Sequence, residues 1–237
     1  MLSGELGDRL VAVGEIPSAT VEEIPSATVE VVTARVASPR YVRFVKPILD
    51  RVGGLVLSIV TIPVVIPMLV AIRLTMGSGP LFVQDRVGKD GKSFKVFKLR
   101  TMNADRRSTP VSYVGPDRRL THKSENDPRV TSFGKFLRKY SIDELPQFWN
   151  VLFGSMSLVG PRPELISIVA NYEPWQHQRH VVKPGITGLW QVSERGEIPL
   201  HEATDMDIEY LECISLLTDL QILWRTVPAA MGKRTGF

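Results

Sequence analysis

One stretch of the chain stands out by its hydropathy, because residues 52–72 contain no charged side chain. A straight helix of these 21 residues is long enough to span a hydrocarbon core about 30 Å thick. The preceding segment, RYVRFVKPILDR, is basic and aromatic, which is typical of a helix at the headgroup level. The stretch begins too far from the N-terminus for an ordinary signal peptide, and it has no small-residue cleavage pattern. The pattern therefore predicts a membrane helix.

Two features of this helix argue against a plain crossing. Pro63 and Pro67 lie in its middle, where each removes a backbone donor and bends the helix. Cations flank both ends, and positive flanks that stay cytoplasmic put both ends on one side. A helix that breaks, dips into the bilayer and returns satisfies both observations, although a kinked spanning helix is the alternative from these features alone. The flanking cations are Arg40, Arg43, Lys46 and Arg51 before the stretch, then Arg73, Arg86, Lys89 and Lys92 after it.

Beyond the apolar stretch, the pattern changes to shorter elements. LFVQDRVG and SFKVFKLRTM flank the turn KDGK at residues 89–92, which predicts a β-hairpin. Residues 103–131 are polar and predict an irregular loop, and residues 133–140 resume a helical spacing. Residues 214–231 are amphipathic, which suits either packing on the core or a position on the membrane surface.

Another helix is predicted to begin within the segment LRKYSIDELPQFWNVLFG. Ser141 with Glu144 three residues later forms a capping-box pattern. Pro146 prefers the first helical turn, which would instead make Asp143 the cap. In both interpretations the two acids lie at the positive end of a helix, where free N–H groups gather around anions.

Composition and charge divide the chain into an acidic tail and a basic remainder. The octapeptide EIPSATVE occurs twice in succession, at residues 15–22 and 23–30, within an acidic segment at 1–38 that we expect to be mobile. The first 39 residues carry a net charge of −4, so the rest carries +8. That surface favours phosphates, anionic lipids or nucleic acid. Cys213 is the only cysteine, which excludes internal disulfides and fits a reducing compartment. The four histidines show no zinc-ligand spacing.

Asp143 and Glu144 are the strongest candidates for chemistry. Adjacent carboxylates repel, and one acid is enough to cap a helix, so the pair beside several cations indicates that an anion or a metal binds there. Arg138 lies five residues before Asp143. Arg162 stands between two prolines in GPRP, which limits its backbone freedom and aims its guanidinium as a phosphate clamp requires.

The other candidate cations carry weaker signals. Lys98 and Arg100 project from one face of the second hairpin strand, although solvated strand charges are equally common. Arg179 and Lys183 precede the turn PGITG, whose glycines allow a ligand to approach the backbone or only form a turn. The sequence contains no GxxxxGK[ST], GxGxxG or GxSxG motif, so neither an ordinary ATPase, nor a dinucleotide enzyme, nor a serine hydrolase is indicated.

Taken together, these motifs resemble the bacterial sugar transferase family, the monotopic phosphoglycosyl transferases. The resemblance runs from about Lys46 to Met231, and several long motifs occur in the family order. They are KPILDRVGGLVL, the proline-broken apolar segment, FVQDRVGKDGKSFKVFKLRTM, LRKYSIDELPQFWNVLFGSMSLVGPRP and HVVKPGITGLWQV.

The resemblance implies an activity. Family members transfer a sugar 1-phosphate from a UDP-sugar to a polyprenyl phosphate and release UMP, which begins the assembly of a surface glycan. Asp143 matches the family nucleophile, which forms an aspartyl phosphosugar, and Glu144 matches the residue that assists proton removal from the acceptor. Mg²⁺ is the implied cofactor, with Asp143 as a ligand. Arg138, Arg162, Lys98, Arg100, Arg179 and Lys183 are the expected contacts to substrate phosphates.

The resemblance also favours a re-entrant helix that keeps the domain on the cytoplasmic face of the bacterial inner membrane. Pro63 matches the proline at the family's helix break, but Ile62 stands where serine is common. We therefore expect a helix-rich α+β fold with three parts: an acidic tail at 1–38, a membrane segment at 39–76 and a catalytic domain at 77–237. Interfacial amphipathic helices and downstream glycosyltransferases as partners are also expected. The rival classes are an inactive membrane-anchored scaffold of a polysaccharide machine and a basic nucleic-acid-binding protein, for which the sequence shows no module.

Overall fold

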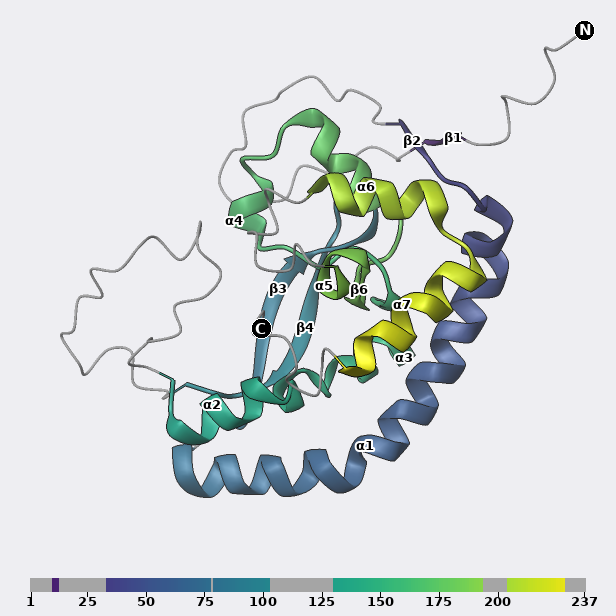
Figure 1. Cartoon of the computed structure of the whole chain (residues 1–237). Helices are drawn as coiled ribbons and strands as arrows, with labels where there is room; N and C mark the ends of the chain where they lie inside the picture. Colours follow the sequence, from purple (N-terminus) through teal and green to yellow (C-terminus); the bar gives the residue numbers. More distant parts are fainter. Residues whose placement is uncertain (1–9, 13–32, 78, 103–129, 194–203, 229–237) are drawn as a thin grey trace, which may run out of the picture.

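The computed structural model describes residues 10–12, 33–77, 79–102, 130–193 and 204–228. These residues form a helix-rich α+β structure in which short strands lie among many helical segments (Figure 1). The strands are β1 (Leu10–Ala12), β2 (Thr33–Arg35), β3 (Leu81–Val87), β4 (Ser93–Leu99), β5 (Ser157–Val159) and β6 (Gly185–Thr187). The α-helices are α1 (Lys46–Met76), α2 (Ser132–Lys139), α3 (Gln147–Phe153), α4 (Ile166–Val169), α5 (Leu189–Val192), α6 (Thr204–Cys213) and α7 (Leu216–Pro228). Tighter or wider helical turns are η1 (Tyr41–Val45), η2 (Lys89–Gly91), η3 (Ile142–Glu144) and η4 (Pro174–Val181). The predicted helix-rich α+β class is confirmed.

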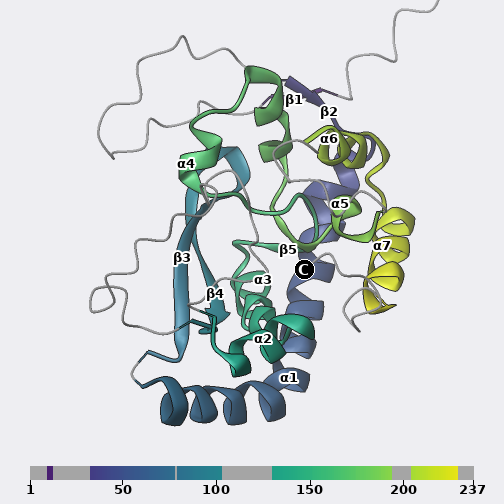
Figure 2. The same ribbon diagram turned by 60° about the vertical axis from the view of Figure 1, so that its left-hand side comes forward.

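The predicted hairpin is present as an antiparallel ribbon of β3 and β4. Its register joins Leu81 to Leu99 at one end and Val87 to Ser93 at the other. Asp90 takes a left-handed conformation with φ 56° inside the turn, as Asp tolerates. Figure 2 shows the ribbon extending between α4 at one end and α1 with α2 at the other.

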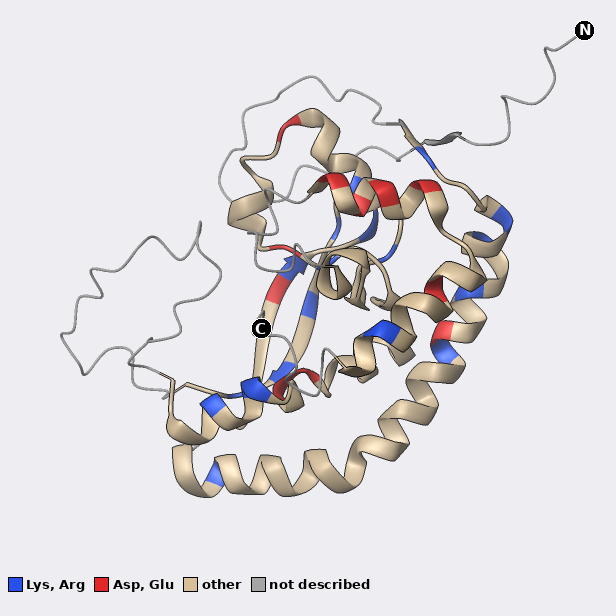
Figure 3. Ribbon diagram, viewed as in Figure 1, with Lys and Arg blue, Asp and Glu red and all other residues tan. Residues whose placement is uncertain are grey.

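The apolar segment forms one long helix, α1, which bends sharply between its two halves (Figure 1). Pro63 and Pro67 lie inside it, and Thr61 donates from its hydroxyl to the carbonyl of Leu57 at 2.7 Å. Proline removes helical donors, and back-bonding by threonine also bends helices, so the bend has a local cause. Among the described residues, Tyr41–Met76 is the one helical stretch long and apolar enough to cross a membrane. Charged side chains are confined to its two ends (Figure 3).

Both halves of α1 lie against the rest of the structure. The first half buries Asp50, whose Oδ1 accepts a hydrogen bond from the backbone N–H of Leu158 at 3.0 Å. The second half buries Val65 and Ile72 in a cluster shared with Leu99 at the end of β4 and Leu137 of α2. The remaining faces of α1 are exposed and apolar. They include Ile48, Val52, Leu55, Val56, Ile59, Val60, Ile66, Val70 and Leu74.

A buried polar network connects the start of α1 to α6 and α7. Lys46 Nζ lies 2.5 Å from Asp219 Oδ2, and the same carboxylate accepts hydrogen bonds from the hydroxyls of Tyr41 and Tyr210. The predicted amphipathic segment is the helix α7, which buries Asp219 and Ile222 and leaves an apolar outer face exposed. That face consists of Leu216, Leu217, Leu220, Trp224 and Val227.

Residues 10–12 and 33–38, within the segment predicted as an acidic tail, are among the described residues. β2 pairs with β1, and Ala34 and Val36 are each 1% exposed in the core cluster formed with β5, η4, α6 and α7. The remainder of the predicted tail, including the repeated octapeptide, lies outside the described residues, as do residues 103–129 of the predicted loop.

The predicted start of the helix after α2 is wrong. The α-helix begins at Gln147, after Pro146, and neither Ser141 nor Asp143 caps it. Ser141 has φ 53° and makes no side-chain cap, and a separate 3₁₀ turn, η3, carries both acids. The capping box does not form because the Glu144 carboxylate is bound instead by cations from distant segments.

Candidate active site

Asp143 and Glu144 lie on η3, the short turn between α2 and α3. The left-handed conformation of Ser141 turns the chain sharply after α2, and the backbone N–H of Glu144 closes η3 by donating to the Ser141 carbonyl at 3.2 Å. A 3₁₀ turn has three residues per turn, so neighbouring side chains point about 120° apart. The two carboxylates therefore face different surroundings although they are adjacent in sequence.

Glu144 is bound by cations from two other segments. Its Oε1 lies 2.7 Å from Lys98 Nζ of β4 and 3.2 Å from Arg162 Nη2 of the loop after β5. These three side chains are partly buried, so their attraction is screened less than at an open surface. The contacts bring together three segments that are far apart in the sequence.

Asp143 has a different environment. It is 9% exposed, and none of the ion pairs in the described part of the chain includes it. Burial raises the pKa of its carboxyl, and the charge of Glu144 raises this pKa further, while Lys98 and Arg138 oppose the shift. The ionised Asp143 is therefore short of positive charge, and a cation placed beside it would favour the carboxylate.

Arg138 reaches the site from the last turn of α2. Its Nε donates to the hydroxyl of Thr101 at 2.9 Å, just beyond the end of β4, and burial lowers the pKa of its guanidinium. The close approach of α2 to this strand end requires Gly134, because an added Cβ would lie 2.0 Å from the Thr101 carbonyl oxygen. Gly134 thus allows α2 to lie close enough to the strand end for Arg138, one turn later, to reach Thr101.

Asn150 joins α3 to the hairpin and was not predicted from the sequence. Its side-chain amide donates to the carbonyl of Lys95 at 2.7 Å and accepts from the backbone N–H of Phe97 at 3.0 Å. Asn150 is 2% exposed, so these bonds satisfy polar backbone groups that would otherwise be buried without partners. The link aligns β4 with η3 and places Lys98 over Glu144. A polar residue within the apolar run QFWNVLF was the available signal.

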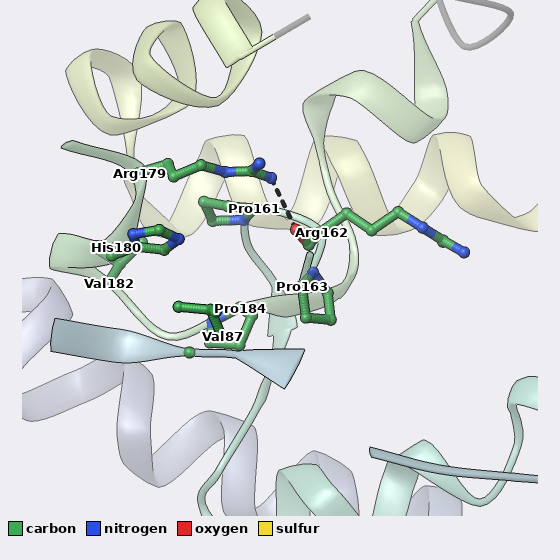
Figure 4. A pocket seen from close by; sticks show the side chains of 9 residues that line it. Val87, Pro161, Arg162, Pro163, Arg179, His180, Val182 and Pro184 are labelled. Carbon is green, nitrogen blue, oxygen red and sulfur yellow. Dashed lines mark hydrogen bonds between the residues drawn. The ribbon is translucent and has the colours of Figure 1, made fainter. Parts of the chain in front are cut away.

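Two arginines hold the backbone of the GPRP loop. Arg179 Nη2 donates to the carbonyl of Arg162 at 2.7 Å, and Arg86 Nη1 donates to the carbonyl of Pro163 at 3.2 Å. Figure 4 shows the Arg162 side chain pointing away from the small pocket that its own backbone lines. The two hydrogen bonds from Arg179 and Arg86 therefore fix the backbone of the loop, while the guanidinium of Arg162 extends toward Glu144. The sequence predicts Arg86 only as a cation that flanks the apolar stretch.

The six cations predicted as phosphate contacts separate into two groups. Lys98, Arg138 and Arg162 surround the two acids. The structure gives the other three different contacts. Arg179 is 1% exposed and pairs with Asp207 at 2.5 Å, Arg100 lies against Gly79, and Lys183 lies beside Gly154.

The acids fit a magnesium ion by their donor chemistry. Mg²⁺ takes hard oxygen ligands, and in phosphoryl-transfer sites it uses one or two carboxylates and completes its shell with substrate phosphates and water. Asp143 has such an oxygen donor, and no cation within the described ranges pairs with it. In the part of the chain that the structure describes, no three His, Cys, Asp or Glu side chains gather as a complete ligand set. The residues therefore suit an ion that arrives with a phosphate.

The chain is similar to known proteins over most of its length. The bacterial sugar transferase family matches residues 41–233. A UDP-galactose-lipid carrier transferase of Erwinia amylovora is 37% identical over 202 residues, which cover 82% of this chain and 42% of the relative. A UDP-glucose:undecaprenyl-phosphate glucose-1-phosphate transferase of Escherichia coli is 38% identical over 195 residues, which cover 77% of this chain and 40% of the relative.

A shorter relative is matched over most of its length. The exopolysaccharide production protein ExoY of Sinorhizobium fredii is 37% identical over 174 residues, which cover 70% of this chain and 76% of the relative. The chain spans less than half of the Erwinia and Escherichia proteins. The match to the family extends from η1 through α7 and includes every residue of the acid pair and its cations, so the chain belongs to the bacterial sugar transferase family.

Proposed function

We propose that this protein transfers a sugar 1-phosphate from a UDP-sugar to undecaprenyl phosphate, or a similar polyprenyl phosphate, and releases UMP. The names of the Erwinia and Escherichia relatives support the donor and acceptor classes, and that of the Sinorhizobium relative supports a role in exopolysaccharide synthesis. One observation carries the proposal: a buried Asp143, which no cation of the described residues pairs with, lies beside a Glu144 that two cations already bind.

The first step uses Asp143 as the nucleophile. A carboxylate oxygen attacks the phosphorus that bears the sugar, and the bond from this phosphorus to the bridging oxygen breaks. UMP leaves with the bonding electrons, and the sugar phosphate remains on Asp143 as an acyl phosphate. Burial makes the carboxylate poorly solvated, which favours attack once its charge is shielded. Arg138 and Arg162 supply fixed positive charge near the transferring phosphoryl group.

The second step releases the sugar phosphate to the lipid. An oxygen of the polyprenyl phosphate attacks the same phosphorus, and the acyl phosphate bond breaks to restore the Asp143 carboxylate. Glu144 takes the proton of an acceptor in its monoanionic form, and Lys98 and Arg162 hold the Glu144 carboxylate in position for this role. Asp143 would hold a Mg²⁺ ion together with substrate phosphates, and such an ion would supply further charge neutralisation at the site. The covalent step lets a soluble donor and a membrane-bound acceptor use one site in turn.

The proposal places the enzyme at the cytoplasmic face of the inner membrane with α1 re-entrant. A straight helix of 31 residues would extend about 46 Å and carry its second half away from the domain. Instead, the first half contacts β5 through Asp50, and the second half packs Val65 and Ile72 on α2 and β4. A bend that returns the helix to the domain supports entry and exit on one side of the bilayer.

Turnover with a donor panel tests the function. The full chain, purified in detergent or nanodiscs with Mg²⁺ and undecaprenyl phosphate, is expected to release UMP with at least one UDP-sugar and to form the matching lipid diphosphosugar. The panel also identifies the sugar. Zero UMP with every donor, from protein whose fold is verified, would contradict the proposal and favour the inactive scaffold.

Cysteine labelling tests the membrane arrangement separately. In a chain carrying Cys213→Ser, the single replacements Phe44→Cys and Thr75→Cys put exposed thiols near the two ends of the helix. We expect an impermeant maleimide to label both from the cytoplasmic side of oriented vesicles. Labelling from opposite sides would establish a spanning helix.

A further inference from the structure

Two cationic side chains, those of Arg51 and Lys183, lie near the C-terminal end of α3. The acid pair lies at the opposite end of this helix. A side chain at Gly154 would begin 3.5 Å from Arg51 Nη2 and 3.5 Å from Lys183 Nζ. Because both distances start from one point, these two groups lie no more than twice 3.5 Å apart. Arg51 comes from α1 and Lys183 from the segment before β6, so the tertiary structure creates the pair.

The pair has little negative charge to balance it. Among the described residues, neither Arg51 nor Lys183 takes part in an ion pair or a side-chain hydrogen bond. Asp50 acts on Lys183 at longer range, but it is buried and accepts the backbone N–H of Leu158. Burial lowers the pKa of Lys183, and the charges of Arg51 and Lys89 lower it further. An arriving anion would relieve this repulsion.

Gly154 keeps the space between the cations open. Its φ is +85°, a conformation that ends α3 and disfavours any side chain. The backbone on the other side is rigid, because the Lys183 carbonyl packs against Gly160 and the next residue, Pro184, accepts a hydrogen bond from Ser157 N–H at 2.8 Å. Gly154 thus places no side chain against the two cations, and the backbone that carries Lys183 is held in place.

The surroundings identify the class of anion. Phe153, next to Gly154, is 73% exposed, and Val52 and Leu55 beside Arg51 are exposed on α1. A free phosphate makes no favourable contact with these apolar side chains, whereas a phospholipid buries its acyl chains against them. We propose that Arg51 and Lys183 form a binding site for the phosphodiester headgroup of an anionic phospholipid, with its acyl chains along α1 and Phe153.

This site is separate from the proposed acceptor site. The seven residues of α3 extend about 10 Å between η3 and Gly154, and neither Arg51 nor Lys183 pairs with Asp143 or Glu144. Positive charge near the C-terminal end also stabilises a helix, so the same two cations have a second candidate role in stabilising α3. The experiment below distinguishes these roles.

Ligand-induced stabilisation of the full chain in a neutral detergent tests the site. Dioctanoyl phosphatidylglycerol is titrated, and its apparent Kd is obtained from the shift in unfolding midpoint. We expect Arg51→Gln and Lys183→Gln each to raise the Kd about fivefold, and the double variant about 25-fold. Arg73→Gln, an exposed cation at the other end of α1, is the matched control and should leave the Kd unchanged. The charge-preserving pair Arg51→Lys with Lys183→Arg should restore most of the binding.

Several results would overturn the proposal. A double variant that is less stable without lipid but keeps the wild-type Kd would show that the cations only stabilise α3. Equal stabilisation by inorganic phosphate, or by dioctanoyl phosphatidylcholine, would reject an anionic-lipid site. Displacement of the probe by farnesyl phosphate would assign the two cations to the acceptor site instead. We expect Asp143→Asn protein to keep the probe bound in the presence of farnesyl phosphate.

Discussion

Two aspartates in this protein have raised pKa values for the same reason, but their surroundings differ. Burial raises the pKa of Asp143 and raises that of Asp207 to about 6. Asp207 and Arg179 are each 1% exposed at the side chain and lie 2.5 Å apart, which we call the interior pair. Asp143 has no such partner in the described part of the chain and lies beside the cations bound to Glu144, which we call the dyad site. A raised pKa alone therefore does not distinguish the two aspartates, whereas the presence or absence of a paired cation among the described residues does.

The largest expected effect comes from removing the carboxylate of the dyad site. Asp143→Asn should lower turnover by about 10⁴-fold or more, because an amide cannot form the acyl phosphate. The covalent adduct should also be absent from mass spectra of protein mixed with the donor alone. The control is Asp85→Asn, an exposed aspartate of β3, which should retain activity and adduct. An adduct on the Asp143→Asn protein would reject this residue as the nucleophile.

Breaking the interior pair should lower the stability of the fold and not only the turnover. Arg179→Met leaves Asp207 buried without its partner and should lower the free energy of unfolding by about 3–5 kcal/mol. The double variant Arg179→Met with Asp207→Leu removes both charges and should recover much of that loss, as measured by unfolding in detergent. If the single variant is as stable as the wild type, then the pair has no structural role.

Arg162 connects the two regions, because Arg179 holds its backbone while its side chain binds Glu144. Arg162→Ala should lower turnover by about 10²- to 10³-fold, with little change in the unfolding midpoint. Arg162→Lys keeps the charge but loses the planar fork, so it should recover activity only in part. Lys135→Ala, an exposed cation of α2, is the control. Full activity of Arg162→Ala would remove this residue from the dyad site.

The smallest expected effect is a shift in the pH profile. Asp143 must be ionised to attack, and Lys98 lowers its raised pKa. Removal of that charge in Lys98→Met should raise this pKa, so the acid limb of kcat/KM should move to higher pH. Lys98→Arg should return the limb toward its original position. Lys95→Met, on the opposite face of β4, should leave the limb in place, and an equal shift in both Met variants would argue against a local charge effect.

The regular elements were predictable, whereas the local structure at the acids was not. The hairpin and α2 follow from short-range patterns, and the structure has both. The capping box was predicted from Ser141 and Glu144 but does not form, since Lys98 and Arg162 bind the Glu144 side chain. Asn150 was missed because its partner Phe97 lies 53 residues away in the sequence. Local patterns carry no information about such contacts.

The sequence by itself determined the apolar helix with its central prolines, the adjacent acids and the arginine between two prolines, because each depends on neighbouring residues. The tertiary structure alone decided which cations surround the acids. Lys98 and Arg162 converge on Glu144, Arg179 is buried beneath the loop, and Lys183 meets Arg51. Electrostatic interaction depends on distance and burial, and the order of residues in the chain fixes neither for side chains brought together by folding.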